Sequence, residues 1–208
     1  MRYVLISDGS SDNALLPVLD FLLKSVIPEE EIFGERADLG RLLKPPKKLE
    51  EKIIITFELY EPDFIFIHGD AEKMQISDRE NEIDIAINKA LKNNSLPNMF
   101  KVIPIRMTES WLLIDEKAIK CAASNPNSRV RLQLPNIRKL ESIPDPKGKL
   151  EKLIMSASEL SGRRLQSLNL RYCIQLVSMY INDFSILENL SAYNHLKSQI
   201  VNYFEDYK

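Results

Sequence analysis

Short apolar runs alternate with segments of helical periodicity along the first half of the chain. The apolar runs have strand length and predict three strands, over residues 3–7, 63–68 and 100–105. Apolar positions at helical spacing predict four helices, over 13–27, 47–61, 77–93 and 108–123. Because strands that alternate with helices form parallel sheets with crossover helices, the pattern predicts an α/β fold with a mostly parallel sheet.

Prolines and polar residues refine the ends of these elements. Pro17 lies inside a helical pattern, so that helix is expected to begin late or to bend there. Ser77 and Glu80 have the spacing of a capping box at the start of the third helix. Pro104 cannot donate a ladder hydrogen bond, so it predicts an edge strand or a strand that ends there. Residues 28–46 have no clear period and are expected to be irregular, with one short strand at most.

The character of the sequence changes after Ala123. Residues 124–149 are rich in Pro, Asn and Ser and predict an irregular connection. Helical spacing then predicts further helices, over 150–160, 165–181 and 185–207. The expected organisation is an α/β domain over 1–123 and, over 124–208, the connection followed by a helical C-terminal subdomain.

The composition narrows the class of protein. The 208 residues are 44% hydrophobic and 28% charged, which is enough apolar content for a compact core. No apolar run reaches the roughly 20 residues that cross a bilayer, so we expect a cytoplasmic protein without a membrane partner. The net charge of −2 gives no overall positive field, so a nucleic-acid surface must be a local patch or come from a partner. Cys121 and Cys173 lack the spacing of a zinc site and are expected to be ordinary buried thiols.

Acids follow each of the three predicted strands. They are Asp8 and Asp12, then Asp70 and Glu72, then Glu109. The carboxyl ends of parallel strands meet at one edge of a sheet, where functional groups collect. Carboxylates with little histidine or thiolate are the ligand set of Mg²⁺ or Mn²⁺, and such an ion removes their mutual repulsion. The alternative is a set of solvated loops in which Asp8 or Asp12 caps the first helix.

Basic residues near these acids are candidates for binding phosphate. They are Lys73, Arg79 and Arg106. Arg106 precedes Glu109 by three residues, and the two alternatively form a structural ion pair. Lys147 is expected to be a solvated surface side chain. His68 lies in an apolar strand, where a hydrogen-bonded core histidine is more common than a ligand or base, and Trp111 is expected to pack in the core.

Three segments carry a resemblance to a known family: "LISDGSSD", "DFIFIHGDAE" and "VIPIRMTESWLLID". Their order resembles a Toprim-type domain, the Rossmann-like catalytic fold of topoisomerases, primases and the overcoming-lysogenization-defect nucleases. The chain is more closely similar to a bacterial family of Toprim-like proteins that accompany ATPases in phage-defence loci. Signatures of this closer family are "TESWLLID", "DPKGKL" and "FSILENLSAYNHL".

The resemblance implies roles for individual residues. It implies a divalent-metal site at Asp8, Asp12, Asp70 and Glu72. It implies catalytic roles for Asp8, Asp70, Glu72, Arg106 and Glu109. Asp8 stands where the Toprim pattern has a glutamate, and Glu72 where it has an aspartate. Both keep the negative charge but change the length of the side chain that would extend toward the metal ion. Nucleases of this type use one or two divalent ions to activate water and stabilise the reacting phosphate.

The implied function is a nuclease that uses Mg²⁺ or Mn²⁺ to cut DNA or RNA. It would be the effector of an antiviral defence system and work with an AAA or ABC-type ATPase. One alternative is a degenerate Toprim scaffold that binds an ATPase or nucleic acid without cutting. Another is a phosphotransfer or phosphatase-like enzyme. The C-terminal helices fit partner docking or a homodimer.

Overall fold

Four parallel strands form one sheet in the computed structural model. The structure describes residues 1–205 except the side chain of Ser10, so the end of the last predicted helix, 206–207, lies outside the described residues. The strands are β1 (Arg2–Ile6), β2 (Phe33–Arg36), β3 (Phe64–His68) and β4 (Asn98–Val102). Their order is β2-β1-β3-β4 and every pairing is parallel. The predicted α/β class with a parallel sheet is confirmed.

The central strands are those with the longest unbroken apolar runs. β1 is buried from Tyr3 to Ile6 and β3 from Phe64 to Ile67, because helices cover both faces of the sheet. β2 is the single short strand allowed for in residues 28–46. β4 is an edge strand and ends before Pro104, as predicted, although it starts two residues earlier than expected.

Eight α-helices lie within the described residues. They are α1 (Leu16–Val26), α2 (Leu49–Tyr60), α3 (Ile76–Leu91), α4 (Glu116–Ala122), α5 (Pro146–Ser158), α6 (Gly162–Gln166), α7 (Leu170–Tyr180) and α8 (Ser191–Glu205). Short 3₁₀ helices join them: η1 (Ser10–Leu15), η2 (Leu39–Arg41), η3 (Thr108–Leu112), η4 (Ile137–Ser142) and η5 (Ser185–Asn189). None of the helices described is both long enough and apolar enough to pass through a bilayer.

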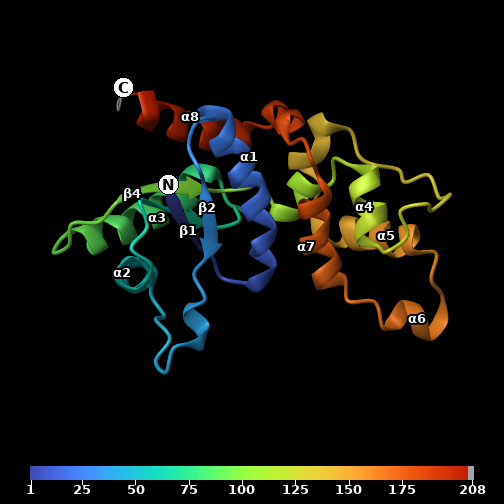
Figure 1. Cartoon of the computed structure of the whole chain (residues 1–208), viewed down its shortest axis with the longest axis horizontal. Coiled ribbons are helices and arrows are strands. Elements are labelled where there is room, and N and C mark those ends of the chain that lie inside the picture. The colour runs from blue at the N-terminus through green and yellow to red at the C-terminus, as the bar shows by residue number, and fades with distance from the viewer. Residues whose placement is uncertain (206–208) are drawn as a thin grey trace.

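The sheet separates two apolar layers. Ile65 and Ile67 of β3 pack on one face with residues of α2 and α3. Phe64 and Phe66 point to the other face, where α1 and α8 lie. This second core continues into the group of helices α4 to α7 at the far end of the molecule (Figure 1).

The predicted α/β and C-terminal parts share this larger core. Trp111 of η3 is fully buried, as expected, and its ring meets that of Tyr193 of α8 edge-on, with centroids 5.7 Å apart. Ile154 of α5 and Val177 of α7 belong to the same apolar cluster as Leu5 of β1. The C-terminal helices are therefore packed against the sheet layer and not tethered beside it. Of the two thiols, Cys173 is buried, whereas Cys121 is half-buried.

Several helices begin at other residues than the apolar periodicity predicts. Pro17 lies in the first turn of α1, which begins late as expected, after η1. The predicted capping box of Ser77 and Glu80 is wrong. The amide groups of Asp78 and Arg79 already donate to the Gln75 carbonyl, at 3.1 and 3.3 Å, so the first turn of α3 closes before Ser77.

Asp side chains set two other helix starts that periodicity misplaced. The helix predicted over 108–123 is split into η3 and α4, because Asp115 accepts hydrogen bonds from the amides of Lys117 and Ala118. The helix α5 begins inside the expected connection, because Asp145 accepts a 2.8 Å hydrogen bond from the Gly148 amide.

Gly34 of β2 lies against the Tyr3 ring, and Gly34→Ala is expected to destabilise the fold by about 2 kcal/mol. A Cβ at Gly34 would stand 2.1 Å from the ring carbon of Tyr3 that bears the hydroxyl. The ring cannot retreat easily, because it is fully buried and its hydroxyl donates to Asp20 at 2.8 Å. Urea denaturation measures the effect. Gly40→Ala is the matched control, since among the described residues no atom beyond the neighbouring backbone lies within 4 Å of the place that the added methyl group would take. An equal loss in both variants would contradict the steric argument.

Candidate functional site

The acids cluster at the carboxyl edge of the sheet, between β1 and β3. At this point the strand order reverses direction, which is where parallel α/β sheets bind ligands. A hollow of about 360 Å³ lies there. It is lined by Asp8, Gly9, Ser11, Asp12, His68, Gly69, Asp70, Glu72 and Arg79. The structure therefore brings together all four acids that were predicted to bind metal.

Two loops that follow β3 and β4 are joined by backbone hydrogen bonds. These run from the amides of Gly69, Ala71 and Glu72 to the carbonyls of Val102, Pro104 and Arg106, at 3.1, 3.0 and 3.0 Å. Glu72 and Arg106 have φ angles of 52° and 69°, the left-handed region, which costs roughly 1–2 kcal/mol for a residue with a side chain. The pairing overcomes that cost and fixes where Asp70 and Glu72 leave β3.

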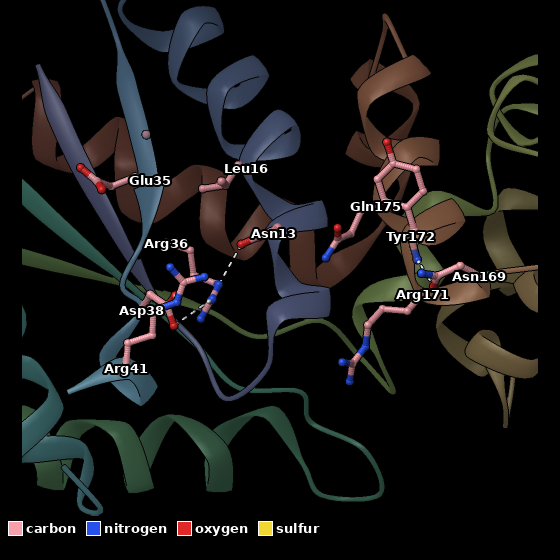
Figure 2. A pocket seen from close by; sticks show the side chains of 11 residues that line it. Asn13, Leu16, Glu35, Arg36, Asp38, Arg41, Asn169, Arg171, Tyr172 and Gln175 are labelled. Carbon is pink, nitrogen blue, oxygen red and sulfur yellow. Dashed lines mark hydrogen bonds and ion pairs between the residues drawn. The ribbon is translucent and has the colours of Figure 1, made fainter. Parts of the chain in front are cut away.

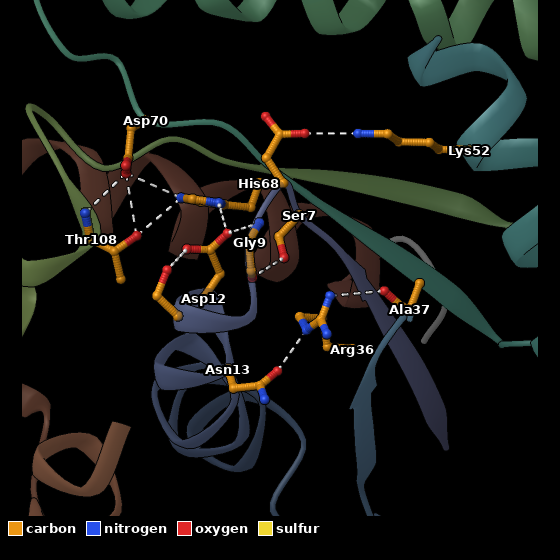
Figure 3. Close-up of polar contacts among 12 residues, drawn as sticks. Ser7, Gly9, Asp12, Asn13, Arg36, Ala37, Lys52, His68, Asp70 and Thr108 are labelled. Atoms are coloured by element: carbon orange, nitrogen blue, oxygen red, sulfur yellow. Dashed lines mark hydrogen bonds and ion pairs between the residues drawn. The ribbon is translucent and has the colours of Figure 1, made fainter. Parts of the chain in front are cut away.

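Asp70 is oriented by Thr108, the first residue of η3. Its Oδ1 accepts hydrogen bonds from the Thr108 amide at 2.9 Å and from the Thr108 hydroxyl at 3.3 Å (Figure 3). The same oxygen lies 3.1 Å from Nε2 of His68. Asp70 Oδ2 has no hydrogen bond from the described residues. One oxygen of this carboxylate is thus held in place and the other is left open.

His68 lies between two carboxylates. Its side chain is only 5% exposed, and Nδ1 lies 3.5 Å from Asp12 Oδ2 on the side opposite to Asp70. Burial alone would lower the pKa of His68, but the hydrogen bonds and charges of Asp12 and Asp70 raise it to about 9. The imidazole is therefore protonated at neutral pH. It supplies the positive charge between the two acids, a role that the sequence reasoning did not assign to it.

Asp12 is fully engaged within the protein. Oδ2 also accepts a 3.1 Å hydrogen bond from the Gly9 amide at the start of η1, and Oδ1 lies 3.4 Å from the Ser11 hydroxyl. Burial works to raise the pKa of Asp12, but the His68 hydrogen bond and charge outweigh it and lower the pKa. The geometry fits the capping alternative for Asp12 better than a ligand role.

Asp8 and Glu72 are the open acids of the hollow. Asp8 is 91% exposed, and its Oδ1 pairs with Lys52 Nζ of α2 at 2.7 Å, a partner that no sequence signal indicated. Oδ2 of Asp8 and both carboxylate oxygens of Glu72 have no hydrogen bond from the described residues. The side chains of residues 1–205 include no group of three or more His, Cys, Asp or Glu already arranged to hold a metal ion.

Glu109 is buried beside the site and does not contribute to the lining of the hollow that the structure describes. It is 6% exposed. Burial raises its pKa, and the negative charges of Asp70 and Asp12 act in the same direction, whereas its own amide and the charge of Lys147 oppose the shift. Lys147 is exposed, as expected, yet close enough to affect Glu109.

The predicted phosphate-binding residues divide into two groups. Arg79 lines the hollow, where Nε donates to the Asp70 carbonyl at 3.1 Å and a terminal nitrogen pairs with Glu82 at 2.6 Å. Arg106 donates to the Glu72 carbonyl at 3.4 Å, and the described structure contains no ion pair between Arg106 and Glu109, so that alternative is wrong. Its left-handed backbone turns it toward the Glu72 loop instead. Lys73 is exposed and is not among the residues that line the described hollow.

Comparison with known proteins identifies no relative: no protein-family model, curated protein or solved structure matches the chain.

Proposed function

We propose that this protein hydrolyses phosphodiester bonds in nucleic acid with the help of Mg²⁺ or Mn²⁺. One observation carries the proposal: Asp8, Asp70 and Glu72 come from the loops of two adjacent parallel strands, line one hollow, and each keep a carboxylate oxygen to which no described residue donates a hydrogen bond. An all-carboxylate set of open oxygens fits a hard divalent cation. When bound, such a cation polarises a phosphoryl oxygen and lowers the pKa of a water molecule.

The other residues of the site have supporting tasks in this proposal. His68 and Thr108 hold Asp70 in one orientation through Oδ1. Arg79 is fixed at the wall of the hollow and offers positive charge to the phosphate. Asp8 acts as ligand or as general base. Arg106 and Glu109 support the loop positions from outside the hollow.

The family resemblance extends the proposal. On that basis the protein would act in the cytoplasm as an antiviral effector and work with an ATPase. The assignment to the Toprim type rests on the same resemblance. The parallel α/β sheet is consistent with it but is shared by many other folds.

Cleavage of a nucleic-acid panel tests the proposed activity. Labelled single-stranded DNA, duplex DNA and RNA are incubated with protein and Mn²⁺, and a parallel reaction contains EDTA. We expect cleavage that EDTA abolishes and that falls by about 100-fold or more in the Asp8→Ala/Glu72→Ala double variant. Asp78→Ala, which removes an exposed acid of α3, is the matched control and should retain activity.

Three outcomes would count against the nuclease. They are cleavage that survives EDTA, equal cleavage by the double variant, and absence of cleavage of every nucleic acid. Hydrolysis of p-nitrophenyl phosphate without nucleic-acid cleavage would support the phosphatase-like alternative.

A scaffold that binds without cutting is the second candidate. It is favoured by the position of His68, whose ring nitrogens lie 3.5 Å from Asp12 Oδ2 and 3.1 Å from Asp70 Oδ1 and so offer both acids a partner from the protein itself. Nucleic-acid binding by a wild-type protein that cuts none of the panel would support it.

A further inference from the structure

A second and larger hollow adjoins the acid site. It has a volume of about 690 Å³ and lies between the carboxyl end of β2 and the start of α7 (Figure 2). Asn13 of η1 lines it, whereas the preceding residue, Asp12, lines the acid hollow. Figure 3 shows both sides of this connection in one view, with Asn13 and Arg36 near Asp12 and His68. The two hollows are therefore neighbours across a single 3₁₀ turn.

One arginine of this hollow is held rigidly. The side chain of Arg36 is only 15% exposed. Its Nε donates to Asn13 Oδ1 at 2.8 Å, and a terminal nitrogen donates to the Ala37 carbonyl at 3.1 Å. The weak 3.7 Å approach of Asp38 neutralises it only in part. The guanidinium is thus a pre-oriented positive group in the wall, which is suited to binding a phosphate.

Two further arginines surround the opening. Arg41 is exposed and pairs with Asp38 at 2.7 Å. Arg171, at the start of α7, has no ion pair or hydrogen bond through its side chain in the described part of the chain. The remaining acid of the lining, Glu35, is already paired with Arg2 at 2.6 Å. On a chain whose net charge is −2, this is a local positive patch of the kind that a nucleic-acid surface requires.

An aromatic ring stands next to the free arginine. Tyr172 is 56% exposed, and the described residues offer no hydrogen bond to its hydroxyl. The amide side chains of Asn169 and Gln175 lie on the same side of the hollow (Figure 2). Exposed aromatic rings beside arginines bind single strands, because unpaired bases stack on the ring while the phosphates meet the charges. A duplex keeps its bases stacked on each other and cannot use such a ring.

We propose that this arginine-lined hollow binds a single strand of nucleic acid and leads it to the acid site. Arg36, Arg41 and Arg171 contact phosphates, and a base stacks on Tyr172. The direction toward the acids rests on the proposed function, but strand binding itself needs neither metal nor cleavage.

Fluorescence anisotropy in EDTA tests the binding separately from the chemistry. The probes are labelled single strands of about 12 thymidine or uridine nucleotides, with the duplex of equal length for comparison. We expect Arg171→Ala and Tyr172→Leu each to weaken single-strand binding by about tenfold. Between about 50 and 200 mM salt, Arg171→Ala should also lower the slope of log affinity against log salt by about 0.7.

Matched substitutions outside the hollow control for general effects of charge and surface. Arg164→Ala on α6 and Tyr180→Leu at the end of α7 replace exposed residues of the same types and should bind as the wild type does. Three outcomes would each overturn the inference: wild-type affinity in both hollow variants, a preference for the duplex, or no binding of single strands at all. Weakened binding in a protein that cuts nothing would reject the proposed function and retain this site. Cleavage by the wild type together with unchanged binding in the hollow variants would retain the proposed function and reject this site.

Discussion

Asp70→Asn is expected to remain folded and to lose divalent-metal binding. The asparagine keeps an oxygen that can accept from the Thr108 amide, as Asp70 Oδ1 does at 2.9 Å, so the loop geometry should survive. It removes the negative charge that the open Oδ2 would offer to a cation. Isothermal titration of Mn²⁺ and Mg²⁺ into both proteins measures the change. We expect saturable binding by the wild type and an affinity about 100-fold lower in the variant.

This experiment needs neither the substrate nor a partner protein. Asp78→Asn is the control, because it removes one carboxylate from the exposed first turn of α3 without touching the hollow. An Mn²⁺ affinity that is equal in wild type and Asp70→Asn would contradict the assignment of Asp70 as a ligand. The far-UV spectrum and the urea midpoint show whether the variant is folded.

The free energy of unfolding is expected to fall as the pH rises from about 6.5 to 9. The pKa of His68 is about 9 in the folded protein and 6.5 in its unperturbed state, so folding favours the protonated ring. The stabilisation is complete below pH 6.5 and is lost as the pH passes through the folded value. A shift of this size corresponds to on the order of 3 kcal/mol for a buried group. Urea denaturation at fixed pH values in EDTA measures it.

A substitution separates this effect from other titrations. His68→Gln cannot carry the charge, so its stability at pH 6 should lie well below that of the wild type and the decline toward pH 9 should be much smaller. His195→Gln replaces an exposed histidine of α8 and should retain the wild-type profile. Parallel pH profiles for His68→Gln and the wild type would show that the ring is not protonated between Asp12 and Asp70.

The apolar pattern determined the sheet and most of the helices. The runs at residues 3–7 and 63–68 became the buried central strands, because a strand covered by helices on both faces must be apolar on both. Pro104 predicted an edge strand or a strand that ends there, and β4 is an edge strand that ends at Val102, before the residue that has no amide to donate. The acids after β1 and β3 gather at one edge as expected, because parallel strands share the direction of their carboxyl ends, whereas Glu109, after β4, is buried and does not line the described hollow.

Helix starts depended on particular hydrogen bonds that periodicity does not encode. Asp115 and Asp145 each cap a helix, and both are of a residue type that marks such positions. At α3 the residue type was misleading. There the Gln75 carbonyl accepts the first hydrogen bonds of the helix. The loop of residues 69–72, which is paired with the loop after β4, positions the chain so that the helix begins before Ser77.

Only the tertiary structure decided the charges and partners of the site. His68 meets a threonine 40 residues away and Asp8 meets a lysine 44 residues away, and both contacts depend on strand order and register. The Arg106 side chain lies at the Glu72 loop and not at Glu109, because the backbone pairing of two loops sets its φ angle. The sequence by itself determined which groups reach the carboxyl edge, since that follows from local pattern. Which of them are buried, paired or open follows from long-range packing. That packing determines the protonation of His68, and it leaves Asp8, Asp70 and Glu72 each with an oxygen that no described residue contacts by a hydrogen bond.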